Sequence, residues 1–203
     1  IGAPKIFYDQ ASSQYLLTWH TTHEMGDTDL PEPYWAGQRT LYATTRDLKT
    51  FSNPPRKLFA WDMAMIDTIV RRVGDRYYAI FKDERYPSLG WPTGKTIRIS
   101  SADHLIGPYT QPGPPVSPNF REAPTLIPAP DGKVWYLYYE QYPGVAYGLS
   151  VANNLNGPWF QAAGGTQYRN WDKYTIPAKA RHGSMLPITC IQYQALIEAF
   201  DSE

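Results

Sequence analysis

The chain has 203 residues, a length that favours one folded domain over residues 1–203. Its 19 basic and 19 acidic residues give a formal net charge of zero, so no general electrostatic attraction favours nucleic acid or an anionic membrane as a partner. The sequence has no apolar run of about 18 residues, so it predicts no transmembrane segment. The single cysteine, Cys190, excludes an internal disulfide and a cysteine-built metal site.

The composition favours short strands and frequent turns. Aromatic residues make up 15% of the chain, beside 19 prolines and 15 glycines. Aromatic rings are also common platforms for sugars, although most such rings in an all-β protein pack in its core. The composition therefore predicts an all-β protein.

Three pairs of strand-like runs follow one another along the chain, and a short turn joins each pair. The runs lie at 3–8 and 14–19, at 67–70 and 76–81, and at 124–127 and 134–139. Gly74 and Asp75 in the second turn, and Asp131 and Gly132 in the third, are typical of hairpins. The sequence predicts three antiparallel hairpins.

Each hairpin is followed by two further matched pieces. A third run lies at 40–45, 96–100 and 146–150, and a fourth piece with a Leu, a turn and an aromatic residue lies at 47–51, 105–109 and 155–159. The units start near Pro4, Asp67, Pro124 and Gly183, about 60 residues apart, and runs 183–188 and 193–200 are expected to open a fourth sheet.

Repeated four-stranded antiparallel units are typical of a β-propeller, in which each unit is one blade. The alternative is a plain β-sandwich, which would not show matched four-strand blocks. A propeller needs at least about four blades to close, so we expect the first blade or blades to be missing from this chain.

Ionisable residues recur near the starts of the predicted first strands, which line the axis of a propeller. They are Asp67, Glu122 and His182. Two converging carboxylates are the minimum equipment for glycoside hydrolysis, because one protonates the leaving oxygen while the other acts as base or nucleophile. The alternative is a structural salt bridge with Arg121 or Arg181.

Three motifs, in this order and at blade spacing, resemble glycoside hydrolase family 43. They are the segments 65–70, 121–126 and 181–185, and the segments 3–9 and 42–52 resemble the second blade of that family. The family comprises five-bladed β-propellers that act as α-L-arabinofuranosidases, β-xylosidases and arabinanases. The resemblance therefore implies a five-bladed propeller of four-stranded antiparallel blades, with its first blade missing here.

The resemblance also implies roles for individual residues. Glu122 matches the general acid, whose pKa should be raised by burial and a nearby carboxylate, and Asp67 matches the carboxylate that tunes it. His182 matches an axial histidine that touches water or a metal beneath the sugar; its alternative is a hydrogen-bonded core histidine. Four further residues are expected to contact the substrate: Arg181, Trp19, Lys82 and Tyr142.

The sequence departs from the family pattern in two places. The Arg-Asp-Pro motif that carries the general base is absent, and Ala123 stands where the family has Gly after the acid, which matters only if the backbone there needs positive φ. No cofactor is required and no residue is assigned as a metal ligand, while a structural calcium near the axis is compatible with the resemblance.

The sequence thus predicts an extracellular glycoside hydrolase that cleaves terminal α-L-arabinofuranosyl or β-D-xylosyl linkages of plant-type polysaccharides with inversion. Its N-terminal leader would precede the present start. The alternative is a catalytically inactive carbohydrate-binding propeller. A scaffold for protein partners is disfavoured by carboxylates at axial positions.

Overall fold

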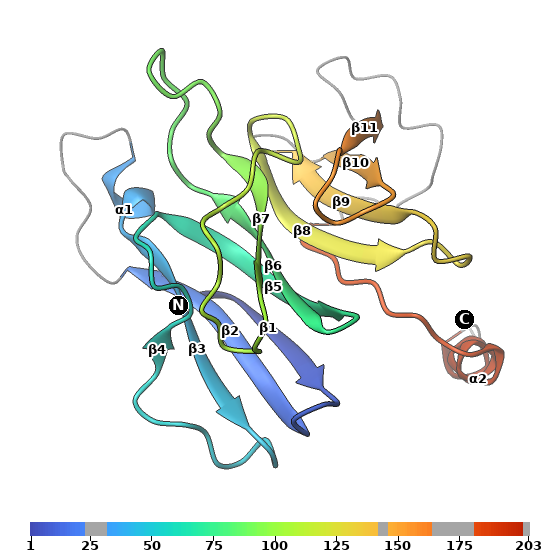
Figure 1. Cartoon of the computed structure of the whole chain (residues 1–203). Coiled ribbons are helices and arrows are strands. Elements are labelled where there is room, and N and C mark those ends of the chain that lie inside the picture. The colour runs from blue at the N-terminus through green and yellow to red at the C-terminus, as the bar shows by residue number, and fades with distance from the viewer. Residues whose placement is uncertain (23–31, 142–145, 164–180, 201–203) are drawn as a thin grey trace.

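The computed structural model describes residues 1–22, 32–141, 146–163 and 181–200, and these are all-β with three antiparallel sheets (Figure 1). The first sheet has the order β1 (Gly2–Asp9), β2 (Gln14–Thr22), β3 (Gln38–Thr45) and β4 (Arg56–Lys57). The second comprises β5 (Met65–Val73), β6 (Arg76–Asp83) and β7 (Thr96–Ala102). The third comprises β8 (Arg121–Pro128), β9 (Trp135–Gln141), β10 (Ala146–Ala152) and β11 (Phe160–Ala163). The described helices are α1 (Pro33–Ala36) and α2 (Cys190–Phe200). Neither described helix is long enough to cross a membrane.

The three hairpins predicted from the sequence are confirmed as β1–β2, β5–β6 and β8–β9, and the third runs form β3, β7 and β10. Four strands are present in the first and third sheets, whereas the second has three among the described residues. The fourth strands β4 and β11 lie after the recurring Leu-turn-aromatic pieces. In the second and third pieces the aromatic side chain returns to the Leu carbonyl and closes the turn: Tyr109 donates to Leu105 O at 2.8 Å and Trp159 to Leu155 O at 3.2 Å.

Neighbouring sheets pack face to face through apolar cores. Figure 1 shows the sheets side by side in chain order, and β5 contacts both β1 and β8. One buried cluster, with Leu16 and Phe81, joins the first and second sheets, and another, with Ile80 and Leu137, joins the second and third. The first strands of all three sheets line a cavity of about 610 Å³. This arrangement is the one predicted for propeller blades, while the count of five blades and the missing first blade stay predictions.

Each first strand carries a bulge at the same point. The register of the ladder shifts between Gly2 and Lys5, between Ile66 and Ile69, and between Glu122 and Thr125. The bulged residues Ala3, Asp67 and Ala123 have φ of 42°, 57° and 51°. The backbone at Ala123 therefore does need positive φ, which costs a non-glycine residue roughly 1–2 kcal/mol.

The expected opening of a fourth sheet is wrong for residues 193–200, which form most of α2. Residues 193, 196, 197 and 200 follow helical rather than strand spacing. The helix begins with a capping box, in which the N–H of Gln192 donates to Thr189 Oγ1 at 3.2 Å and the N–H of Thr189 donates to Gln192 Oε1 at 2.9 Å. Residues 183–188 belong to no strand.

We predict that Gly148→Ala destabilises the third sheet. A Cβ at Gly148 would lie 2.2 Å from Cε2 of Tyr139, the residue opposite it on β9. The Tyr139 ring is fully buried and its hydroxyl is hydrogen-bonded to Ser150, so it has little room to move. Urea unfolding should show a loss of about 1–3 kcal/mol. Gly90→Ala, where a Cβ meets open space, should stay within about 0.5 kcal/mol of wild type. Equal stabilities of the two variants would contradict the packing described.

Candidate active site

Asp67 and Glu122 lie at the same end of neighbouring sheets. Asp67 occupies the bulge of β5, and Glu122 immediately precedes the bulge of β8. Asp67 Oδ2 accepts a hydrogen bond from the Ala123 N–H at 2.9 Å, and the two acidic residues are only 1% and 7% exposed. The structure therefore brings together the two carboxylates that the sequence singled out.

Three cationic side chains surround the Glu122 carboxylate. Lys82 Nζ lies 2.8 Å from Oε2, Arg181 Nη2 lies 3.1 Å from Oε1, and His182 Nε2 lies 3.6 Å from Oε1. Lys82 is itself buried and also pairs with Glu84 Oε1 at 2.8 Å. Of the expected substrate contacts, Lys82, Arg181 and His182 are therefore at the site, but each is engaged with an acidic side chain.

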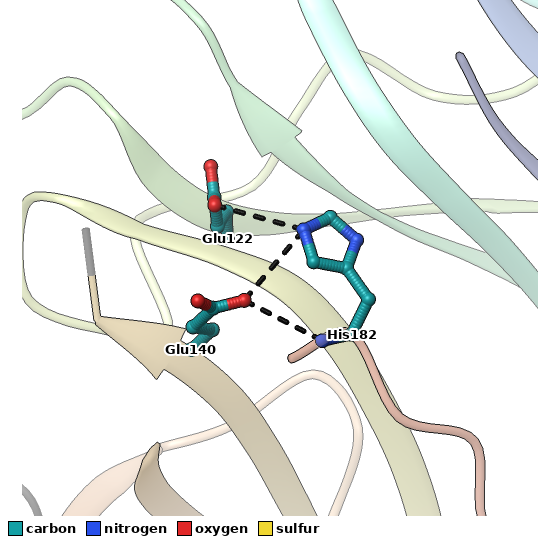
Figure 2. A group of neighbouring side chains, drawn as sticks. All are labelled: Glu122, Glu140 and His182. Atoms are coloured by element: carbon teal, nitrogen blue, oxygen red, sulfur yellow. Dashed lines mark hydrogen bonds and ion pairs between the residues drawn. The ribbon is translucent and has the colours of Figure 1, made fainter. Parts of the chain in front are cut away.

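A buried carboxylate that the sequence analysis missed, Glu140, lies beside them (Figure 2). It faces Glu122 directly across the β8–β9 ladder, and its side chain is 0% exposed. Glu140 Oε2 lies 3.6 Å from His182 Nε2 and accepts the His182 backbone N–H at 3.4 Å. Glu140 Oε1 pairs with Arg181 Nε.

A signal for Glu140 was present in the repeats. In the three ladders Gly2 pairs with His20, Ile66 with Lys82, and Glu122 with Glu140, so the second strands place His20, Lys82 and Glu140 at one equivalent position. Each of them directly follows a matched run, at 14–19, 76–81 and 134–139. Extending the repeat comparison by one residue would have found this layer.

The pKa of Glu122 differs from the expectation. Burial raises it, but the interactions with His182 and with the Lys82 ammonium outweigh burial and lower the pKa of Glu122 to about 2. The expected raised pKa is therefore wrong for the unliganded protein, because the sequence did not show which cations reach the acid.

The pKa values of two basic partners of Glu122, His182 and Lys82, are raised. The interaction with Glu122, opposed by burial and aided by the charges of Asp67 and Glu140, raises the pKa of His182. Burial would lower the pKa of Lys82, but the carboxylates of Glu84 and Glu122 raise it. The acidic groups around His182 and Lys82 thus favour the charged forms of these two side chains.

Glu122, Glu140 and His182 offer ligand atoms within 4.8 Å of one another, close enough to share an ion. Calcium takes six to eight oxygen ligands. The two carboxylates here are already paired with Lys82 and Arg181, and the third donor is an imidazole. This donor set fits calcium poorly.

Trp19, another expected contact, is not at the cluster. Trp19 points to the face of β2 opposite its neighbour His20 and lines a shallow hollow with Leu17, Ala43 and Phe51. Burial lowers the pKa of His20, although the negative charge of Asp67 acts to raise it. Tyr142 lies outside the described residues.

A family model described as "Probable glycosyl hydrolase domain", related to glycoside hydrolase family 43, matches residues 1–194. The chain belongs to this family. Among curated protein sequences, none matches it.

Three similar solved structures show the fold. The catalytic domain of a GH62 α-L-arabinofuranosidase from Coprinopsis cinerea has 13% identity and a TM-score of 0.59, over 83% of this chain and 51% of that one. An α-L-arabinofuranosidase from Lactobacillus brevis has 13% identity and a TM-score of 0.61, over 79% and 53%. The family 117 glycoside hydrolase Zg3597 from Zobellia galactanivorans has 18% identity and a TM-score of 0.55, over 79% and 53%. This chain spans about half the length of these structures, and the likeness supports a propeller-type arrangement of antiparallel sheets.

We predict that ionisation of Glu122 links stability to acidic pH. The lowered pKa means that its contribution is fully present above about pH 4.5 and is lost as the pH falls toward about 2, because the unfolded chain takes up the proton first. Urea unfolding at about pH 5 and about pH 3 should show a smaller loss of stability for Glu122→Gln than for wild type. The control is Asp131→Asn, at an exposed carboxylate on a turn. This variant should lose as much stability as wild type between the two pH values. If Glu122→Gln lost as much stability as wild type between about pH 5 and about pH 3, the ion pairs at Glu122 would be contradicted.

Proposed function

We propose that this chain is part of a glycoside hydrolase that cleaves terminal α-L-arabinofuranosyl or β-D-xylosyl linkages of plant-type polysaccharides with inversion. Membership of a glycosyl hydrolase family supports the reaction, and two similar structures are named as α-L-arabinofuranosidases. In this proposal Glu122 is the general acid and Asp67 sets its position and pKa. The location is extracellular, where such polysaccharides occur.

The observation that carries the proposal is the contact between Asp67 and the residue after Glu122. Two sheets supply one carboxylate each, and the bond from the Ala123 N–H to Asp67 Oδ2 fixes their relative positions. Asp67 Oδ1 is buried and has no hydrogen-bond partner among the described residues. This oxygen lies 4.0 Å from His182 Nδ1, and a sugar hydroxyl that displaced His182 from beside Glu122 would donate a hydrogen bond to it.

A general acid must carry a proton before the leaving oxygen can take it. The Arg181 and His182 side chains are 51% and 35% exposed and lie outside the strands. A sugar that entered the site would displace them from Glu122, and burial, which raises the pKa of Glu122, would then act with less opposition. Substrate binding thus prepares the acid in this proposal, while an Asp outside this chain supplies the general base.

The alternative is a catalytically inactive carbohydrate-binding propeller. One observation favours it: three cations hold Glu122 in its ionised form, which can accept hydrogen bonds from hydroxyls but cannot protonate a leaving group. In that case the same end of the sheets binds a sugar without cleaving it.

We expect the protein that includes both this chain and the general base from outside it to release p-nitrophenol from aryl α-L-arabinofuranosides or β-D-xylosides and to release pentose from oligosaccharides. Glu122→Gln should lower kcat on oligosaccharides by about 10²–10⁴. Its effect on the aryl substrate should be smaller, because p-nitrophenolate leaves without full protonation. Asp67→Asn should lower kcat on both substrates, and Asp131→Asn, at the exposed turn, should match wild type.

Equal losses on the two substrates in Glu122→Gln would contradict its role as the acid. Calorimetric binding of arabinose or xylose oligosaccharides without any release would support the binding-only alternative. A folded protein that neither binds nor cleaves them would contradict both functions.

A further inference from the structure

Glu140 is a fully buried carboxylate for which the proposed reaction has no role. It sits on β9, directly opposite Glu122, and the groups that face it come from several elements: Glu122 of β8, Tyr147 of β10, and Arg181 and His182. An ionised carboxylate at such a site is costly unless it is paired. Its cationic partners lie on the segment 181–188.

That segment belongs to no sheet. Residues 181–188 form no strand, and His182 has a φ of 34°. Ladder hydrogen bonds, which fix the other site residues on β5, β6 and β8, are not what holds Arg181 and His182 in place. Figure 2 shows instead that Glu140 reaches both the imidazole and the backbone N–H of His182. Its other oxygen pairs with Arg181 Nε.

The same two residues also reach the candidate acid. Arg181 approaches Glu140 through Nε and Glu122 through Nη2, so one guanidinium bridges both carboxylates. The His182 Nε2 atom lies 3.6 Å from an oxygen of each. A shift of the segment away from Glu140 would therefore remove two of the three cations at Glu122.

We propose that Glu140 is the positioning residue that docks Arg181 and His182 onto the third sheet and thereby places them against Glu122. The contacts of Glu140 with Arg181 and His182 thus take the place of strand pairing for this segment. Its catalytic consequence rests on the proposed function, since Glu122 must be the acid for its partners to matter. The docking itself is independent of any reaction.

The test compares Glu140→Gln with Glu84→Gln. Glu84 is an equally buried carboxylate, but its ion pairs are with Lys82 and Lys95. In Glu140→Gln the His182 amide should exchange with solvent about tenfold faster, as expected for a lost charge-assisted hydrogen bond. The pKa of the His182 imidazole, followed by NMR, should fall toward its ordinary value of 6.5. Glu84→Gln should leave both readouts at their wild-type values.

A second variant keeps the test decisive if Glu140→Gln fails to fold. Arg181→Gln changes a side chain that is 51% exposed. It should also speed exchange of the His182 amide, because it removes the ion pair between Arg181 and Glu140. The proposal is overturned if, in either folded variant, the His182 amide exchanges and the His182 imidazole titrates as in wild type.

Activity provides a separate readout. In an active protein Glu140→Gln should lower KM more than it changes kcat and should shift the pH profile of kcat/KM, because Arg181 and His182 no longer occupy Glu122 before the sugar binds. If the protein that includes the general base from outside this chain is inactive, and Glu140→Gln still releases His182, the proposed function is refuted and the docking role is supported. An active one with unchanged KM, pH profile and exchange in Glu140→Gln would refute the docking role alone.

Discussion

The need to compensate buried acidic groups governs this end of the molecule. Glu84, Glu122 and Glu140 are all at most 7% exposed, and cations lie between them: Lys82 between Glu84 and Glu122, and Arg181 between Glu122 and Glu140. Removing one member of such a chain leaves an uncompensated buried charge, which typically costs about 3–5 kcal/mol. The alternating charges therefore tie the second sheet, the third sheet and residues 181–182 into one constellation, although ladder hydrogen bonds connect none of these parts to one another.

The backbone prepares this constellation through a repeated irregularity. A regular strand would point successive side chains to opposite faces, whereas the bulge in each first strand turns the local backbone by inserting one residue. In β5 the inserted residue is Asp67 itself, and in β8 it is Ala123, so that the two carboxylates lie one step apart along their strands. The two inserted residues are themselves joined, because Asp67 Oδ2 accepts the Ala123 N–H.

Much of this organisation could be predicted from the sequence, because hairpins and repeats depend on local patterns. The three hairpins and the convergence of Asp67 with Glu122 follow from the matched runs. The ion pairs do not, since which cation reaches which acid depends on side chains brought together across sheets, and the lowered pKa of Glu122 depends on them. Strand alternation places Trp19 on the face of β2 opposite His20. Residues 193–200 form a helix rather than the expected strand, because their apolar residues have helical spacing and Thr189 begins a capping box.

We propose that Glu122 and Asp67 form a sugar site that Arg181 and His182 occupy until a ligand arrives. A crystal structure of the protein with bound arabinose or xylose would test it most directly. The account predicts a sugar whose hydroxyls contact Asp67 Oδ1 and the Glu122 carboxylate, with the Arg181 and His182 side chains moved away from Glu122. A sugar bound elsewhere, with both side chains still in place on Glu122, would contradict it.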